Sequence, residues 1–422
     1  MTNVLVVGSG GREHTLVWKL SQSPGLGALY CAPGNAGTAG VATNLDVADT
    51  DIDGLVGAAH AHAIDLVVVG PEAPLAAGLA DRLRDDGFLV FGPDQAAAQI
   101  ESSKSWAKEI MEEWGVPTGR AVVVRTPVEA RAALDAAGLP VVVKADGLTT
   151  GKGVYVCAER DEAEQAIHLL MEEGVFGSAG ATVLIEEFLE GLEVSLLALT
   201  DGETILPLMP ACDYKPIGED DTGPNTGGMG SYCPPGAVDS ALVDSIVRAV
   251  IEPALAGIRA RAGGFRGVLY AGLILTANGP KVLEFNCRFG DPETQVVLPM
   301  LETDFLELCL ATARGELARA PELAWAPGGC VAVVLASEGY PGSYRTGLEI
   351  SGLDDLPEGG LVFHAGTAPD DGRTVTAGGR VLAAVGRGDS LEEARDRAYA
   401  TADAIQFEGA YRRADIARRE IH

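Results

Sequence analysis

The sequence lacks long apolar runs and a leader-like N-terminus. No apolar stretch in its 422 residues approaches the length needed to cross a bilayer. The opening MTNVLVVGSGGREH has neither a basic flank nor a small-residue cleavage site. We therefore expect a cytoplasmic protein with no membrane partner. Because one core rarely serves so long a chain, we also expect several domains.

Paired cysteines and metal-binding histidines are missing as well. The seven cysteines are odd in number, lie far apart and form no CxxC pair, which argues against a disulfide framework and a zinc cluster. The histidines show no metal-ligand spacing, and no Ser/His/Asp arrangement can be assembled. We interpret the histidines as structural, with His14 lying beside a glycine-rich loop.

Basic residues are few, since 31 Lys and Arg stand against 60 Asp and Glu, a net charge of -29. A field of that sign repels nucleic acids and anionic membranes, so we expect no nucleic-acid partner. A small phosphorylated ligand is compatible with it where basic side chains and glycine amides gather locally. We interpret most of the acidity as a solvated surface that aids solubility.

The first hundred residues alternate apolar runs with helical patterns. NVLVVG, IDLVVVG and FLVFG each precede an amphipathic segment, and such alternation predicts βαβ units and a parallel sheet. We expect a Rossmann-like α/β domain over residues 1–101.

The middle of the chain predicts a mixed α+β domain over residues 102–327. Thr126 and Pro127 give a start signal for the helix PVEARAALDAAG. Asp-Gly and Asn-Gly turns between apolar runs, in LLALTDGETILPL and LYAGLILTANGPKVLEFN, predict two hairpins.

The remainder predicts a small C-terminal α+β domain over residues 328–422. CVAVVLAS, LVFHAGT and GGRVLAAVG are typical strands, and SLEEARDRAYATADAI is a typical helix. Ser390 and Glu393 have the spacing of a capping box.

The stretch ADGLTTGKG has the composition of a phosphate loop without its spacing. Only three residues separate Gly147 from Gly151 where a phosphate loop has four, and Gly153 follows Lys152 where Ser or Thr is required. The apolar GVYVCA follows, so the loop joins two strands and predicts a hairpin flap that closes over phosphates. Lys144, at the end of the preceding strand, points toward the same place. The alternative is an ordinary glycine-rich turn.

The stretch VLEFNCRFGDPETQ predicts a metal site. Glu284 and Asn286 are two apart on a strand, so both project from one face. Oxygen ligands at that spacing suit Mg²⁺ completed by phosphate and water. The alternative is strand alternation with Glu284 paired to Arg288, but Asp291 and Glu293 make this strand end unusually polar.

Two further glycine-rich loops predict anion binding. In DTGPNTGGMG, the amides around Asn225 and Thr226 are placed to cradle a carboxylate or phosphate, and the alternative is a mobile surface loop. In VVGSGGREH, Gly10, Gly11 and Arg12 at a helix start suit one phosphate, although the third glycine of a dinucleotide fingerprint is missing.

Together these motifs resemble the ATP-grasp superfamily and, within it, the phosphoribosylamine-glycine ligase family. The resemblance covers essentially the whole chain: GSGGREH, APGNAGT, VGPEAPL, KADGLTTGKGV, IEEFLEGLEVS, DTGPNTGGMG, LYAGLIL, EFNCRFGDPETQ, GYPG-YRTG and HAGT. It implies a central ATP-grasp fold whose flap subdomain spans about residues 119–190, preceded by a substrate-binding domain.

The resemblance also implies roles for individual residues. Those implied at the nucleotide are Lys104 and Lys144 on phosphates, Gly147, Gly151, Lys152 and Gly153 in the flap, Glu187, Phe188 and Leu189 at adenine, and Glu193 at ribose. Those implied at the substrates are Gly10, Gly11, Arg12, Asn35 and Glu72 for phosphoribosylamine, and Asp213, Asn225, Thr226, Arg288 and Asp291 for glycine and the acyl phosphate. Glu284 and Asn286 are the implied metal ligands, and Gly272 stands where many ATP-grasp enzymes carry another, which leaves the number of metal ions open.

The implied reaction uses ATP as co-substrate and Mg²⁺ or Mn²⁺ as cofactor. Glycine is phosphorylated to glycyl phosphate, and the amine of phosphoribosylamine displaces phosphate, which forms glycinamide ribonucleotide for purine biosynthesis. Lys144, Arg288 and Asp213 are the expected catalytic residues. We expect a monomer with small-molecule substrates and a transient hand-over to neighbouring purine enzymes.

Three other functions stay open from the sequence. They are an ATP-grasp ligase with another amino acid or amine, a nucleotide-binding regulator without catalysis, and a first domain that belongs to an NAD-dependent oxidoreductase. Glycine-dependent ADP release, the effect of Glu284→Ala on activity, and binding of NADH in place of ATP distinguish them.

Overall fold

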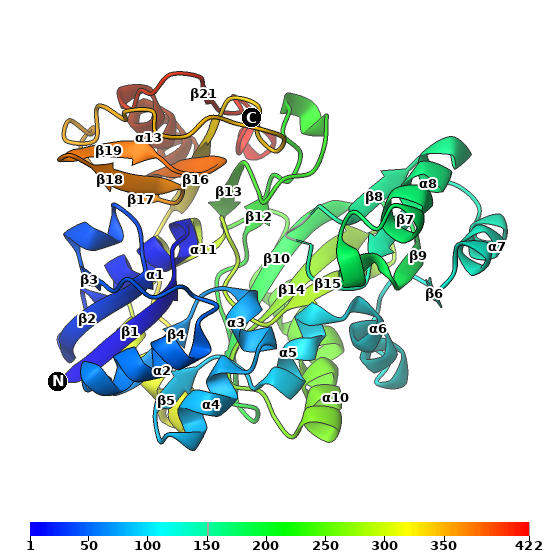
Figure 1. Cartoon of the computed structure of the whole chain (residues 1–422), viewed down its shortest axis with the longest axis horizontal. Coiled ribbons are helices and arrows are strands. Elements are labelled where there is room, and N and C mark those ends of the chain that lie inside the picture. Colours follow the sequence, from blue (N-terminus) through cyan, green and yellow to red (C-terminus); the bar gives the residue numbers. More distant parts are fainter. Residues whose placement is uncertain (150–151, 422) are drawn as a thin grey trace.

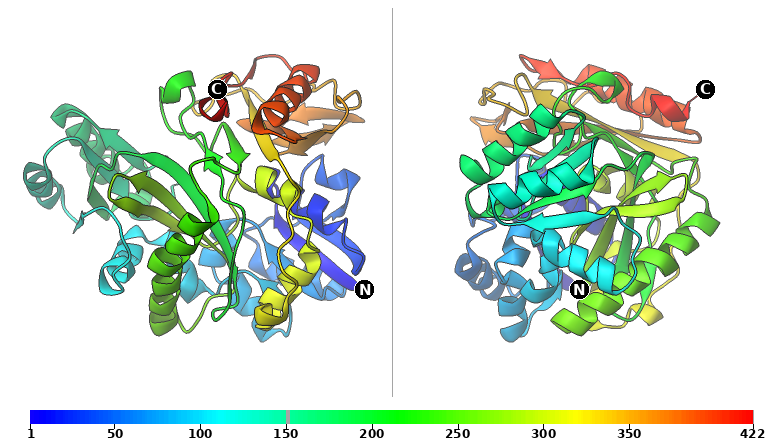
Figure 2. Two further views of the ribbon diagram at one scale, coloured as in Figure 1. Left: turned by 180° about the vertical axis from the view of Figure 1, so that it is seen from behind. Right: turned by 90° about the vertical axis from the view of Figure 1, so that its right-hand side faces the viewer.

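The computed structural model describes residues 1–149 and 152–421. Figures 1 and 2 show the N-terminal and C-terminal sheets stacked on one side, a central sheet beside them, and a lobe that projects on the other side. The predicted parallel N-terminal sheet and the mixed α+β central and C-terminal parts are confirmed.

The N-terminal sheet is parallel throughout, in the order β3-β2-β1-β4-β5. Its apolar runs are buried because helices cover both faces, as in other parallel sheets. The strands are β1 (Thr2–Gly8), β2 (Leu26–Pro33), β3 (Thr43–Asn44), β4 (Leu66–Val69) and β5 (Leu89–Phe91). The helices are α1 (Gly11–Leu20), α2 (Ile52–Ala61), α3 (Glu72–Ala76), α4 (Leu79–Asp85) and α5 (Gln95–Ser102).

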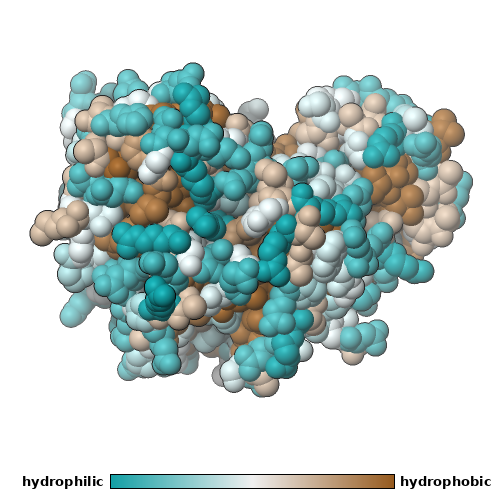
Figure 3. Space-filling view, turned by 90° about the horizontal axis from the view of Figure 1, so that it is seen from below, coloured by the Kyte–Doolittle hydropathy of each residue, from teal (hydrophilic) through white to brown (hydrophobic). Residues whose placement is uncertain are grey.

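The projecting part, here called the flap lobe, is built on an antiparallel sheet in the order β6-β9-β7-β8. Its strands are β6 (Ala121–Val124), β7 (Val141–Ala145), β8 (Val154–Cys157) and β9 (Val183–Glu187), and its helices are α7 (Pro127–Ala137) and α8 (Arg160–Ile167). The glycine-rich stretch connects β7 to β8, so the predicted hairpin is confirmed. Figure 3 shows the lobe set off from the rest by an indentation in the surface.

The central sheet is antiparallel, in the order β11-β10-β14-β15. Both hairpins predicted from the Asp-Gly and Asn-Gly turns are present, as β10 with β11 and β14 with β15. The strands are β10 (Leu192–Thr200), β11 (Ile205–Pro207), β14 (Gly267–Thr276) and β15 (Gly279–Asn286). The helices of this part are α6 (Lys104–Glu113), α9 (Ser240–Ile246), α10 (Glu252–Ala262), α11 (Thr294–Met300) and α12 (Phe305–Arg314).

The C-terminal sheet recruits two strands from the middle of the chain. Its order is β12-β13-β16-β20-β17, with β21 paired to β16. The strands are β12 (Cys212–Asp213), β13 (Gly230–Cys233), β16 (Gly329–Ser337), β17 (Gly360–His364), β20 (Arg380–Gly388) and β21 (Ala410–Tyr411), with the separate hairpin β18 (Thr367–Asp370) and β19 (Arg373–Thr376) and the helix α13 (Leu391–Ala404). The glycine-rich loop between β12 and β13 is therefore anchored in the C-terminal sheet.

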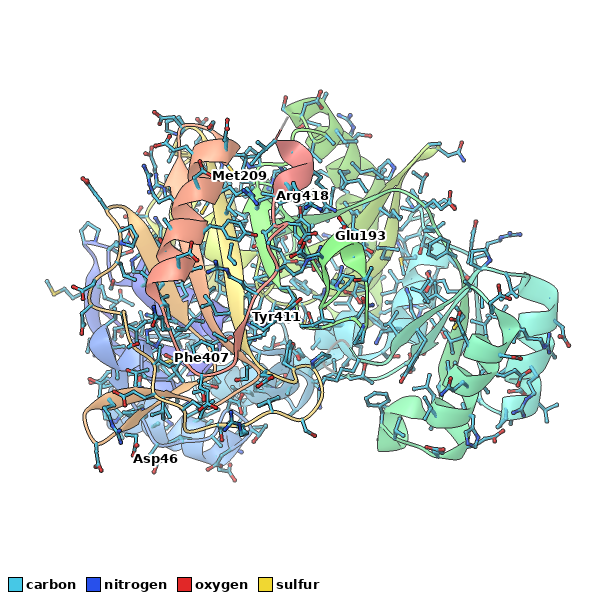
Figure 4. The ribbon with its side chains drawn as sticks, turned by 90° about the horizontal axis from the view of Figure 1, so that it is seen from above. Asp46, Glu193, Met209, Phe407, Tyr411 and Arg418 are labelled. Atoms are coloured by element: carbon cyan, nitrogen blue, oxygen red, sulfur yellow. The ribbon has the colours of Figure 1, made fainter. Side chains whose placement is uncertain are left out.

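The last segment of the chain lies over that loop. Figure 4 follows it from Phe407 past Tyr411 to Arg418. The Tyr411 hydroxyl donates to the carbonyl of Ile217 at 2.9 Å, and Arg418 pairs with Asp220 at 2.5 Å. The C-terminal segment thus restrains a loop that belongs to the middle of the sequence.

The helix start signals are confirmed at one helix and only half correct at the other. At α7, the Thr126 hydroxyl accepts from the Glu129 amide and the Glu129 carboxylate accepts from the Thr126 amide, a complete capping box. At α13, the Ser390 hydroxyl accepts from the Glu393 amide, but the Glu393 carboxylate accepts from Asp389 instead. The capping box predicted for Ser390 is wrong in that second bond.

All seven cysteines are free and buried, as the scattered positions predicted. Over residues 1–149 and 152–421, none of the helices has both the length and the apolar character required to span a membrane.

Candidate active site

A cavity of about 300 Å³ lies where the four parts of the molecule meet. Its walls come from α1, α3 and α5 of the N-terminal part, from β7 and β9 of the flap lobe, from β15 of the central sheet, and from β20 of the C-terminal sheet. Residues predicted from the sequence that line it are Arg12, Glu72, Lys104, Lys144, Asp213, Thr226, Glu284, Asn286, Arg288 and Asp291.

Other predicted residues lie outside the lining. They are Gly10, Gly11, Asn35, Gly147, Lys152, Gly153, Glu187, Phe188, Leu189, Glu193 and Asn225. Gly151 falls outside the described residues. Some lie next to the cavity: the Gly147 carbonyl accepts from Lys104 Nζ at 3.1 Å, and Asn35 Nδ2 donates to the carbonyls of Ser9 and His364 at 2.8 Å each.

Two lysines share one buried carboxylate in the flap-lobe wall. Glu186, only 2% exposed, lies 2.5 Å from Lys108 Nζ through Oε1 and 2.7 Å from Lys144 Nζ through Oε2. Burial lowers the pKa of Lys108, although Glu186 opposes the shift. Lys144 Nζ also donates to the Leu283 carbonyl at 3.2 Å. The ammonium group of Lys144 is therefore held at the cavity wall by a flap-lobe carboxylate and a central-sheet carbonyl.

Neighbouring glutamates on β9 point to opposite faces of the sheet. Glu186 pairs in register with Val142 and shares the cavity face with Lys144, whereas Glu187 lies on the other face. The Glu187 carboxylate accepts from the Arg120 amide at 3.1 Å, away from the cavity. The side chain that enters the site is thus the one before the predicted residue, and a role for Glu187 at adenine would pass through its backbone.

Glu284 and Asn286 fit a divalent cation. Both stand on β15 and line the cavity from one face, as their spacing predicts. Neither side chain makes a hydrogen bond or ion pair within residues 1–149 and 152–421, so their oxygens are available as ligands. The same residues contain no group of three or more His, Cys, Asp or Glu that could hold a metal. Two oxygen ligands completed by phosphate and water are what Mg²⁺ commonly uses.

Arg288 is held by two carboxylates rather than by Glu284. Its Nε lies 3.1 Å from Glu72, and its Nη2 lies 2.7 Å from Glu101. The alternative pairing of Glu284 with Arg288 is therefore wrong. Burial lowers the pKa of Arg288, but Glu101 and Glu72 outweigh it and raise the pKa. In return, Arg288 and Arg12 overcome the effect of burial on Glu72 and lower its pKa to about 2.

The amide of Gly10 at the start of α1 is already engaged by a carboxylate. Glu13 Oε2 accepts from the Gly10 amide at 2.6 Å, and Glu13 Oε1 lies 2.5 Å from Arg12 Nε. A side chain on Gly11 would contact Gln295 at 2.7 Å. Glu13 stands where the glutamate of a capping box stands. A phosphate at this helix start would have to displace its carboxylate from the Gly10 amide.

The amides of the turn at residues 226–228 are also engaged, so the prediction that they cradle an anion is wrong for these three. The Thr226 amide donates to the Lys215 carbonyl at 2.8 Å, and the Gly228 amide donates to the Thr226 hydroxyl at 3.0 Å. The Gly227 amide donates to the Tyr340 hydroxyl at 3.1 Å. At residues 226–228 the backbone donors are thus bound within the protein, and Thr226 is the side chain of this turn that lines the cavity.

Asp213, Lys215 and Glu193 form a chain of charges below that turn. Lys215 Nζ lies 2.6 Å from Glu193, which Figure 4 labels, and 3.5 Å from Asp213. Burial raises the pKa of Asp213 to about 7; Lys215 opposes this shift, and Glu293 and Glu193 reinforce it. Burial lowers the pKa of Lys215, but Asp213 and Glu193 outweigh it and raise the pKa well above its usual value.

The sequence matches one family along three consecutive segments. The N domain of phosphoribosylglycinamide synthetase matches residues 2–101, its ATP-grasp (A) domain matches residues 102–294, and its C domain matches residues 330–419. The chain belongs to the phosphoribosylglycinamide synthetase family.

The similarity of this synthetase family member to its relatives extends over nearly its whole length. A phosphoribosylamine--glycine ligase from Nostoc is 50% identical over 421 residues, 99% of each chain. A trifunctional purine biosynthetic protein from Gallus gallus is 48% identical over 99% of this chain and 42% of its own length. The crystal structure of phosphoribosylamine--glycine ligase from Thermotoga maritima covers 98% of this chain and 99% of its own, with 37% identity and a TM-score of 0.85. A biotin carboxylase domain from Hydrogenobacter thermophilus shares the fold at 18% identity and a TM-score of 0.74, over 97% of this chain and 91% of its own.

Packing against Glu284 explains why glycine stands at position 272 in this member of the synthetase family. It lies opposite Glu284 in the pairing of β14 with β15. A side chain at Gly272 would begin 3.3 Å from Glu284 Cγ and would crowd that carboxylate. At this point of the cavity, the central sheet therefore presents Glu284 and Asn286 without an acidic neighbour on β14.

Several residues that line the cavity were given no role from the sequence: Glu101, Lys108, Glu186, Lys215, Tyr270, Glu293 and Arg380. Some form a buried polar network, in which Glu293 Oε1 accepts from the hydroxyls of Tyr270 at 2.8 Å and Ser195 at 3.0 Å. The density of acidic residues after β15 was a signal for Glu293. Nothing in the sequence pattern pointed to Tyr270, since it stands inside an apolar strand.

Proposed function

We propose that this cavity joins glycine to phosphoribosylamine with glycyl phosphate as the intermediate. By its family, the chain is an ATP-dependent ligase of purine biosynthesis. The observation that carries the proposal for the site is the convergence of Lys104, Lys144 and Arg288 on one cavity with the available oxygens of Glu284 and Asn286. Phosphoryl transfer depends on this combination of positioning and charge stabilisation.

ATP would bind between the flap lobe and the central sheet. Lys104 and Lys144 contact its phosphates, and the backbone of Glu187, Phe188 and Leu189 lies at adenine. Burial lowers the pKa of Lys104, while Glu284 opposes the shift. A phosphate close to Lys104 would favour its charged form in the same way, which supports its assignment to the nucleotide. The flap glycines and Lys152 cover the nucleotide, and Glu193 binds the ribose hydroxyls. Lys152 Nζ donates to the carbonyl of Pro341 at 3.2 Å, so the flap already touches the C-terminal part.

Glu284 and Asn286 would hold Mg²⁺, for which Mn²⁺ can substitute. When bound, the metal withdraws charge from the transferred phosphate. Glu284 and Asn286 would place the charge of the metal beside the phosphates, and Lys144 and Arg288 face the charge that develops during transfer.

The two remaining substrates would lie on either side of the transferred phosphate. Arg12, Asn35 and Glu72, with the Gly10 and Gly11 loop, hold phosphoribosylamine. Asp213, Asn225, Thr226 and Asp291 surround glycine.

The reaction would proceed in two displacements. A carboxylate oxygen of glycine bonds to the γ-phosphorus as the bond from that phosphorus to ADP breaks. The amine then bonds to the carbonyl carbon and loses a proton, and phosphate leaves. Arg288 stabilises the charge on the acyl phosphate, and exclusion of water by the flap protects that intermediate.

Each of the three domains has its own part in substrate binding under this proposal. Residues 1–101 bind phosphoribosylamine, residues 102–327 bind ATP with the flap subdomain at about 119–190, and residues 328–422 complete the pocket. The protein works as a cytoplasmic monomer that hands its product on transiently. A purine biosynthetic relative described as trifunctional supports the hand-over.

The affinity for glycine is expected to depend on pH through Asp213. Its carboxylate attracts the ammonium group of glycine only when ionised, and its pKa is about 7. The ionised fraction therefore rises about tenfold between about pH 6 and about pH 8, and KM for glycine should fall to match. Steady-state kinetics over this range measure the effect. Asp213→Asn should abolish the dependence, and a KM that stays flat in the wild-type protein would contradict the role of Asp213.

ADP release tests the proposed reaction. With Mg-ATP present, it should require both glycine and freshly made phosphoribosylamine, and it should stop when either is omitted. Alanine, serine and β-alanine in place of glycine are the matched controls. Turnover with any of them equal to that with glycine would overturn the assignment of substrate.

A further inference from the structure

Two side chains of the C-terminal part hold Gly227, in the turn at residues 226–228, by both its amide and its carbonyl. The Gly227 amide donates to the Tyr340 hydroxyl at 3.1 Å, and the Gly227 carbonyl accepts from Arg380 Nη1 at 2.6 Å. Tyr340 follows β16, and Arg380 begins β20. These two side chains, here called the Gly227 clamp, fix the position of a residue that lines the cavity beside Thr226.

Arg380 also connects the turn to Asp291. Its Nη1 donates to the Asp291 carbonyl at 3.0 Å and lies 3.1 Å from the Asp291 carboxylate. That carboxylate also accepts from Gln295 at 2.7 Å and from the Arg12 amide at 3.4 Å. Burial raises the pKa of Asp291, but Arg380 and Arg12 outweigh it and lower the pKa. The N-terminal, central and C-terminal parts therefore meet on this one aspartate.

The packing around the clamp leaves no room for side chains on the turn. A Cβ on Gly227 would lie 2.9 Å from Arg380 Cζ, so the guanidinium packs directly on the glycine. Gly228 has a φ of 110°, and a Cβ at this position would overlap with Pro292 Cδ, so only glycine suits both its backbone and its space. The clamp thus acts on a turn that is shaped to receive it.

We infer that Tyr340 and Arg380 are positioning residues of the ligase reaction, which place the 226–228 turn and Asp291 at the glycine end of the cavity. The inference rests on the proposed function, because it assigns this end of the cavity to glycine. The charge pair between Arg380 and Asp291 is 20% and 16% exposed, so solvent screens it less than it screens a surface pair. ATP, at the other end of the cavity, does not depend on the clamp.

Tyr340→Phe is the mildest test, since it removes one hydroxyl. Loss of one hydrogen bond weakens the hold on Gly227 by an amount that corresponds to a rise of about three- to tenfold in KM for glycine. KM for ATP and the unfolding midpoint should stay at wild-type values. Tyr344→Phe is the matched control: its ring contacts that of Tyr340 with centroids 6.3 Å apart, and its hydroxyl makes no hydrogen bond in the described part of the chain.

Arg380 is tested by a pair of variants. Arg380→Ala should raise KM for glycine more than tenfold, because it releases both Gly227 and Asp291. Arg380→Lys should recover part of the loss, since it keeps a charge for Asp291 without the planar fork. In both, KM for ATP should change by less than about twofold.

The outcomes separate this inference from the proposed function. Wild-type values of KM for glycine in Tyr340→Phe and Arg380→Lys, alongside an active wild-type enzyme, would overturn the clamp alone. An equal rise in KM for ATP would also overturn it, because the effect would then be general. A wild-type protein without glycine-dependent ADP release would overturn the proposed function, and the clamp with it.

Discussion

Replacing Arg288 with methionine is expected to lower the free energy of unfolding by about 3 to 5 kcal/mol and to reduce kcat by roughly a hundredfold to a thousandfold. The cause of the instability is the pair of carboxylates left behind. Glu72 and Glu101 contact Arg288 at 3.1 and 2.7 Å, and their side chains are only 20% and 6% exposed. The loss of activity has a separate cause, since methionine cannot stabilise charge on the acyl phosphate.

A triple variant separates the two effects. Adding Glu72→Gln and Glu101→Gln to Arg288→Met removes the unpaired charges, so most of the stability should return. Activity should stay low, because the guanidinium is still absent and Glu72, which the proposed function places at phosphoribosylamine, is altered as well. Denaturant unfolding and ADP release measure the two quantities on the same samples.

Arg259→Met is the surface control for this series. Arg259 pairs with Glu203 at 2.6 Å, with side chains 52% and 78% exposed, so its loss should cost less than about 1 kcal/mol. Wild-type stability in Arg288→Met, or recovery of activity together with stability in the triple variant, would contradict the role given to Arg288.

Replacing Glu284 with glutamine is expected to reduce kcat by about a thousandfold while leaving the fold intact. A bound divalent cation contributes several kcal/mol of charge stabilisation, and each 1.36 kcal/mol corresponds to about tenfold in rate. Glu284 makes no hydrogen bond or ion pair in the described part of the chain. Its replacement should therefore change the free energy of unfolding by no more than about 0.5 kcal/mol.

The dependence of the rate on magnesium identifies the cause. Glu284→Gln and Asn286→Ala should both need a higher Mg²⁺ concentration for half-maximal activity, and Mn²⁺ should be affected in the same direction. Glu307→Gln, at an exposed position of α12, is the control and should behave as wild type. Unchanged magnesium dependence and activity in Glu284→Gln would remove the metal site from β15.

Much of the fold could be predicted because its signals are local. The apolar runs of the first hundred residues indicated the parallel sheet, and two short turns indicated the hairpins of the central sheet. The strand after Lys152 distinguished a hairpin flap from a helix-opening phosphate loop. The recruitment of β12 and β13 into the C-terminal sheet was not predicted, because strands of two and four residues carry little pattern.

The sequence predicted the site residues that belong to motifs. It did not predict those that enter the cavity only because distant segments pack together. Glu284 and Asn286 share a face because strand geometry requires it. Glu186 was missed in favour of Glu187, since the two glutamates are adjacent at the end of an apolar run and the sequence does not say which face of β9 is the cavity. Arg380 was missed because its partners, Gly227 and Asp291, lie 153 and 89 residues away.

The central claim is that the carboxylate of glycine receives the γ-phosphate before the amide forms. Glycine labelled with heavy oxygen in its carboxylate tests this most directly, in a complete reaction with Mg-ATP and phosphoribosylamine. The attacking oxygen should leave with the phosphate, so mass spectrometry should find a single heavy oxygen in the inorganic phosphate released. Phosphate without heavy oxygen, formed together with glycinamide ribonucleotide, would contradict the account.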